Sequence, residues 1–189
     1  YLMRTSYELR GTIQHPSLGA WCHHLGGRHN QTLPGHVIVG GGADLPGAGF
    51  FPPEFQPLPI GSAEDGLQNA NLPRGVDEER FQRRLQKLQQ LDQAFAEQHG
   101  QRAVQSYSKT YAEAVKLMRS SDLTAFDLDL ESPAMHQAYG QTSFGAGCLL
   151  ARRLVEHGVR YVEVMSDGWD THADNFDRVG DLAPAIDQG

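Results

Sequence analysis

Two side chains that can bind a divalent metal ion stand two positions apart in the segment GWDTH: Asp170 and His172. In an extended backbone, residues i and i+2 point to the same side, so the carboxylate and the imidazole are expected to face a common point. Such groups are ordinary ligands of zinc and manganese. We interpret both residues as candidate metal ligands. Asp167 and Asp174 are candidate extra ligands, or acceptors that orient the imidazole. The alternative is an acidic surface loop in which Asp174 caps the next helix.

The elements before this loop place it where ligands usually bind. Residues 143–157 have the pattern of a helix that Gly158 ends, and residues 159–165 are of strand type. A helix, a glycine, a strand and a polar loop make half of a βαβ unit. Because open α/β sheets bind ligands beyond the carboxyl ends of their strands, the loop with Asp170 and His172 would lie at such a site.

A second buried strand is predicted at 36–42, where HVIVGGG runs into three glycines. Their backbone N–H groups could hold an anion, although a tight turn is the more common outcome. Residues 43–75 are rich in Gly, Pro and Asn and predict an ordered irregular excursion.

The remaining pattern is helical. Apolar residues at helical spacing predict a helix over 16–25 and a helical hairpin over 77–118, in which Asp77 is the first cap. On the first helix, Leu18, Trp21, Cys22 and Leu25 are expected on one side. On the helix that Ser143 is expected to cap, the inward residues are expected to be Phe144, Cys148, Ala151 and Val155. The fold class is therefore α/β, a mostly parallel sheet flanked by helices, in a single domain over 1–189 with the hairpin inserted.

Histidine is frequent in the first 36 residues but has no recognised ligand spacing there. His23 and His24 are expected on a solvated helix face, and His15 is the best further candidate for a pocket. Cys22 and Cys148 could pair in an exported protein, yet a free buried thiol is the favoured interpretation of Cys148.

Composition limits the function classes. The net charge is −7 with no basic stripe, which argues against a nucleic-acid partner. No run is long and apolar enough to span a membrane. There is no G-x-S-x-G, P-loop or dinucleotide motif, so no catalytic nucleophile and no substrate-binding residue can be assigned. The sequence begins without a signal peptide and both ends indicate a fragment of a longer chain.

Several blocks together resemble one bacterial family, the proteins of domain of unknown function 1501, which are often labelled sulfatase-like and placed in the alkaline-phosphatase-like superfamily. The likeness covers nearly the whole chain, and its blocks are HPSLGAW (15–21), LPGHVIVGGG (33–42), AFDLDLES (125–132), the run from 138 to 164, and GWDTHADNF (168–176). The last block is specific, whereas the hairpin is not.

The resemblance implies a mixed, mostly parallel sheet between helices and two metal ions, often zinc or manganese, that cleave phosphate or sulfate esters. Asp170 and His172 match the Asp and His that supply part of one metal site. The family is typically exported, to the periplasm or beyond. Its first metal-binding Asp and its nucleophile are not found before residue 15, and its further ligands are expected after residue 189, so this chain would hold a partial site.

Two function hypotheses result. The first is a metal-dependent hydrolase domain acting on a small-molecule or glycan ester. The second is a non-catalytic binding or structural domain of an exported protein that keeps the fold. A weaker third option is a partner-binding role for the 77–118 hairpin. The oligomeric state is open at this stage.

Overall fold

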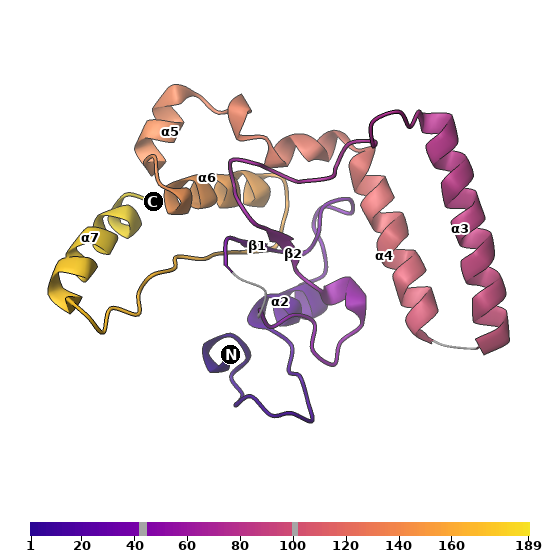
Figure 1. Ribbon diagram of the computed structural model, residues 1–189, viewed down its shortest axis with the longest axis horizontal. Coiled ribbons are helices and arrows are strands. Elements are labelled where there is room, and N and C mark those ends of the chain that lie inside the picture. Colours follow the sequence, from indigo (N-terminus) through magenta and orange to yellow (C-terminus); the bar gives the residue numbers. More distant parts are fainter. Residues whose placement is uncertain (42–44, 100–101) are drawn as a thin grey trace.

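The computed structural model describes residues 1–41, 45–99 and 102–189, and their side chains except over 96–109. Within this part of the chain a parallel sheet of three strands, in the order β2-β1-β3, forms the centre (Figure 1). The strands are β1 (His36–Val39), β2 (Leu58–Ile60) and β3 (Tyr161–Val164). Val37 is level with Leu58 on one side and Val162 on the other. The expected α/β class with a parallel sheet flanked by helices is confirmed.

Helices cover both faces of the sheet. α2 (Leu18–Gly26) contacts β1 and β3 from one face, and α6 (Ser143–Glu156) packs on β3 from the other (Figure 1). β1 lies between two strands and two helices, so all four of its residues are buried, as a central parallel strand requires. The other described elements are α1 (Leu2–Thr5), η1 (Pro53–Phe55), η2 (Ser121–Phe126), η3 (Leu128–Leu130), α5 (Pro133–Tyr139) and α7 (Asn175–Gln188).

The predicted inward faces of α2 and α6 are wrong. In α2, Leu18 and Leu25 are exposed, and Gly19, Ala20 and His23 are buried instead. This helix comes close to the sheet through small residues, since a Cβ at Gly19 would lie 2.3 Å from the His36 ring.

In α6, Val155 is exposed and the buried leucines are Leu149, Leu150 and Leu154. The buried stripe therefore lies beside the one that the spacing favoured. The capping residue also differs: Thr142, one residue before Ser143, accepts a hydrogen bond from the Gly145 N–H at 3.0 Å.

Strand β2 was not predicted, because it lies inside the stretch interpreted as irregular. Its sequence is Leu58-Pro59-Ile60, and proline cannot donate a hydrogen bond to a neighbouring strand. The residue is tolerated since β2 is an edge strand of the sheet that the described residues form.

The helical hairpin is confirmed as α3 (Glu78–His99) and α4 (Arg102–Met118), which pack on each other. Asp77 is the expected cap, since its Oδ1 accepts from the Arg80 N–H at 2.7 Å. α4 also contacts η1 and η2, and Glu113 on α4 forms a 2.8 Å ion pair with Arg28. α3 is thus the outer helix of the hairpin (Figure 1).

Candidate functional site

A cavity of about 470 Å³ opens at the carboxyl ends of the three parallel strands. Every strand contributes to it, through Gly40 and Gly41 after β1, Ser62 and Glu64 after β2, and Ser166 and Asp167 after β3; the first turn of α6 and two residues of α7 complete the lining. This is where open α/β sheets bind ligands, and it is the end of β3 that the sequence singled out.

The loop after β3 is held in place at several points. The Met165 N–H continues the sheet by donating to the Val39 carbonyl at 2.8 Å. Gly168 then turns the chain with a φ of 89°, a conformation that favours glycine. The Trp169 Nε1–H donates to Ser166 Oγ at 2.9 Å. Thr171 is buried, and its hydroxyl bonds the Asn175 side chain at the start of α7. The residues between these anchors are therefore constrained.

Asp170 and His172 do meet, as their spacing suggested. Asp170 Oδ1 and His172 Nδ1 lie 2.7 Å apart, and the two side chains are 87% and 83% exposed. With a proton on Nδ1, the imidazole donates to the carboxylate and presents Nε2 to the surroundings. In this arrangement Nε2 is open to a cation and Asp170 orients the ring; Asp170 and His172 share one ion only when Nδ1 is unprotonated and faces that ion.

The pair fits a metal ion only as part of a larger set. Two ligands of a tetrahedral zinc ion lie about 3.4 Å apart, so Oδ1 and Nδ1 would need to separate slightly to share one. The described residues contain no group of three or more His, Cys, Asp and Glu side chains placed to hold a metal. Asp167 lines the cavity, and Asp174 takes the N-cap position of α7 with a φ of 52° and no capping hydrogen bond.

The glycines after β1 allow the segment that follows β1 to pass close to the segment that follows β3. A Cβ at Gly41 would lie 3.0 Å from Met165 Cγ, and its φ is 82°. The Gly40 N–H donates to the Ile60 carbonyl at 2.8 Å, so this amide belongs to the sheet and is not available to an anion. Gly42 lies outside the described residues.

The other histidines are placed away from this loop. His15 stacks on Tyr7 with ring centres 3.9 Å apart and does not line the cavity. His24 is exposed, as expected, but the solvated face predicted for His23 is wrong, because His23 packs against Gly35 and the ring of Phe55.

His36, at the amino end of β1, is fully buried, and neither ring nitrogen has a hydrogen-bond partner among the described residues. Burial, together with the nearby charges of His23 and Arg4, lowers the pKa of His36 from 6.5 to about 4. This burial could not be predicted, because a histidine at the start of an apolar strand follows no ligand or catalytic motif.

Both cysteines are free and half-buried. Burial raises the pKa of the Cys148 thiol, which keeps it protonated and unreactive at neutral pH. The interpretation of Cys148 as a free thiol is confirmed, although it is not completely buried.

The fold and this site define an α/β domain with a ligand-sized cavity at the carboxyl edge of a parallel sheet. The model of the family described as "Protein of unknown function (DUF1501)" matches residues 1–189, and the chain belongs to that family. No match was found among the curated proteins or among the solved structures. Among the described helices, none has the length and apolar character needed to cross a membrane.

Proposed function

We propose that this chain is part of a metal-dependent hydrolase of phosphate or sulfate esters with an alkaline-phosphatase-like fold. The observation that carries the proposal is the 2.7 Å contact between Asp170 and His172 in the loop that leaves β3 at the carboxyl edge of the sheet. The 470 Å³ cavity at the same edge, which Asp167 lines but Asp170 and His172 do not, has room for a small ester.

The residues of this chain have separate tasks in the proposal. Asp170 and His172 hold the ion, and Asp167 and Asp174 support them as extra ligands or hydrogen-bond acceptors. In this proposal Asp170 and His172 supply part of the metal site of an exported hydrolase, and no nucleophile is assigned among the described residues. A bound zinc or manganese ion polarises the ester oxygen and lowers the pKa of the attacking group.

Metal affinity of paired variants tests this function. We expect the protein to bind Zn²⁺ or Mn²⁺ in a calorimetric titration, and we expect Asp170→Asn and His172→Gln each to weaken binding about tenfold or more. Asp177→Asn and His157→Gln are matched controls, since they change the same residue types elsewhere on the surface. The proposal fails if the two site variants bind metal as tightly as the controls do.

A non-catalytic domain that keeps the fold is the second candidate. The exposure of Asp170 and His172, above 80% for each, favours it, because water competes well for an open site. Under this alternative the longer protein would show no metal-dependent ester hydrolysis, and Asp170→Asn would leave its properties unchanged. Assays with a phosphate ester and a sulfate ester, with and without chelator, distinguish the two candidates.

A further inference from the structure

The two faces of the sheet are packed differently. On the α6 side, Val37 and Val39 of β1 belong to the large apolar core, to which α6 contributes its buried leucines. On the α2 side, the alternation of the strands places His36 and Ile38 of β1 and Tyr161 of β3. Among the described residues, none of α2 belongs to the large core. The contact of α2 with the sheet is therefore a separate and less apolar one.

This contact is built on two buried histidines. A Cβ at Gly19 would lie 2.3 Å from Nε2 of His36, and a Cβ at Gly35 would lie 2.6 Å from the ring of His23. Each ring thus packs against the backbone of a glycine in the opposite layer. Helix and sheet approach one another through these rings, and both rings are closed off from water.

Neither histidine can accept a proton at low cost while the contact is closed. His23 Nε2 accepts from Arg28 Nε at 3.3 Å, so the neutral ring carries its proton on Nδ1, which has no partner among the described residues. A second proton on His23 would also face the Arg28 guanidinium. A proton on His36 would create a buried cation that no described group accepts a hydrogen bond from.

The surrounding charges do not offset this cost. Glu163 pairs with Arg4, and Glu113 pairs with Arg28, so both carboxylates already have a cationic partner. Burial is the largest influence on His23 and lowers its pKa, although Glu113 and Glu54 raise it. The ionisable groups around the two rings are Arg4 in α1, Cys22 and His24 in α2, Arg28 after α2, Glu54 in η1, Glu113 in α4, and Tyr161 and Glu163 in β3.

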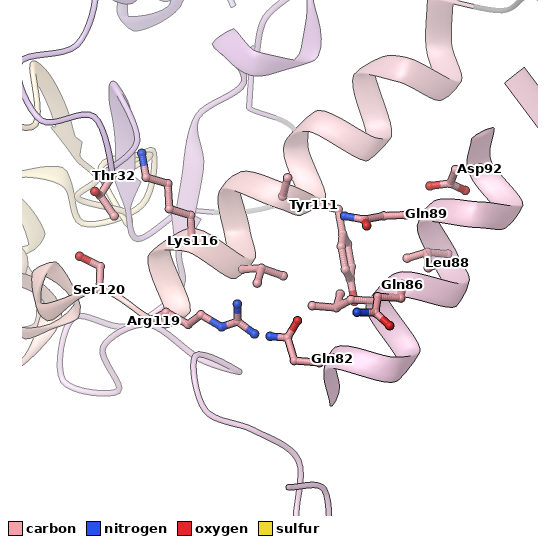
Figure 2. Close-up of a pocket in the computed structure, with 13 residues that line it drawn as sticks. Thr32, Gln82, Gln86, Leu88, Gln89, Asp92, Tyr111, Lys116, Arg119 and Ser120 are labelled. Carbon is pink, nitrogen blue, oxygen red and sulfur yellow. The ribbon is translucent and has the colours of Figure 1, made fainter. Parts of the chain in front are cut away.

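The chain just after α2 is held by the rest of the molecule. Lys116 Nζ donates to the Gln31 carbonyl at 3.1 Å, and Figure 2 shows Lys116 reaching from α4 toward Thr32. Leu33 is completely buried. Between this segment and α2 lies Gly27, which has a φ of 65° and open space where a Cβ would be. Gly27 can therefore act as a hinge for α2 while the following segment stays in place.

We propose that α2 is an acid-sensitive layer, which opens away from the sheet about Gly27 more readily as the solution becomes acidic, while the core between the sheet and α6 stays folded. Opening exposes His23 and His36 to water, where each can take up a proton. Protons therefore bind to the open form and favour it. This inference does not depend on the proposed hydrolase function.

Hydrogen exchange of the backbone amides between pH 7.5 and pH 5 tests the proposal. The pKa of His36 is about 4 in the closed layer and 6.5 in an ordinary environment. The opening equilibrium should therefore rise about 30-fold over this range from His36 alone. After correction for the intrinsic exchange rates, the protection of the α2 amides should fall by about this factor.

A comparison of α2 with α6 shows whether α2 opens by itself. At each pH the α2 amides should be less protected than those of α6. Their exchange should also depend less on added urea, because opening one layer exposes less surface than unfolding the whole chain. Equal protection and equal urea dependence in the two helices of the wild type would overturn the proposal, and so would protection of α2 that does not change with pH.

Two variants identify the histidine responsible. His36→Phe should lack the part of the pH dependence in α2 that His36 contributes. His24→Phe is the matched control, since His24 is exposed on the same helix; it should exchange as the wild type does. A His36→Phe protein whose α2 protection falls with pH as steeply as that of the wild type would contradict the proposal. The comparison of α2 with α6 in the wild type needs no variant.

Discussion

Two histidines show how strongly the surroundings decide what the same side chain can do. His172 is exposed, and its Nδ1 is hydrogen-bonded to the Asp170 carboxylate. His36 is buried between α2 and the sheet with its ring edge-on to Tyr161, and within the part of the chain that the structure describes neither ring nitrogen has a hydrogen-bond partner. The first is open to a ligand from solvent, whereas burial keeps the second neutral at neutral pH.

The neutral state of His36 makes stability depend on pH. The pKa of His36 is about 4 in the fold and 6.5 in an ordinary environment. Between these values the unfolded chain binds a proton that the folded chain does not. The contribution of neutral His36 to the free energy of unfolding is thus fully present above pH 6.5. It is lost as the pH falls toward 4, which lowers the free energy of unfolding by about 3 kcal/mol.

Urea unfolding at several pH values between 7.5 and 4.5 measures this loss. We expect His36→Phe, which keeps a buried ring of similar size, to lose less stability over this range than the wild type does. Some pH dependence of stability should persist in His36→Phe, because burial and Arg28 also lower the pKa of His23. If the stability of His36→Phe depended on pH as that of the wild type does, the loss of stability could not be assigned to His36.

At the scale of elements, a buried ion pair joins α6 to the segment before α5. Arg153 bonds Glu131 Oε1 at 2.6 Å and also donates to the carbonyls of Thr124 and Ala125. Both side chains are only 10% exposed. Removing one partner leaves a buried charge without its counter-charge, which is strongly destabilising.

We therefore expect Arg153→Leu to lower the free energy of unfolding by about 3–5 kcal/mol, measured by urea denaturation. Arg83→Leu is the control. Arg83 pairs with Glu79 on the exposed surface of α3, where ion pairs contribute little, so it should leave stability nearly unchanged. Equal effects in the two variants would show that the Arg153 pair has no special role.

The junction of α5 and α6 depends on a glycine. A Cβ at Gly145 would lie 1.9 Å from the Tyr139 carbonyl oxygen, which the backbone of α5 holds in place. Gly145→Ala should destabilise the fold by about 1–3 kcal/mol, although alanine favours a helix. Gly180→Ala, in α7 with open space around it, should instead stabilise by up to about 1 kcal/mol. Thermal unfolding of the two variants should therefore shift in opposite directions.

The elements themselves could largely be predicted from sequence, and their contact faces could not. Periodicity located α2, α3, α4, α6 and β3, because apolar side chains repeat at the spacing of each element. The same periodicity misplaced the buried faces of α2 and α6. In α2 the close contact with the sheet is made by Gly19 and Ala20, and a pattern of large apolar residues does not detect small ones.

At the scale of the whole molecule, the cavity joins segments that are distant in sequence. Its lining comes from three strand ends and from the first turn of α6, and α7 closes one side. The position of the Asp170–His172 loop could be predicted, since a strand and its following loop are adjacent in sequence. The contribution of Ser62 and Glu64 could not be predicted, because these residues follow β2 and the proline in β2 is untypical of a strand.

The central claim, that the loop after β3 holds a cation, is tested most directly by anomalous diffraction from crystals containing zinc. We predict an anomalous peak at the zinc edge about 2.0–2.2 Å from an Asp170 oxygen and a His172 nitrogen. That peak should be absent in His172→Gln crystals soaked in the same way. Zinc bound elsewhere in the protein, with no anomalous density at this loop, would contradict the claim.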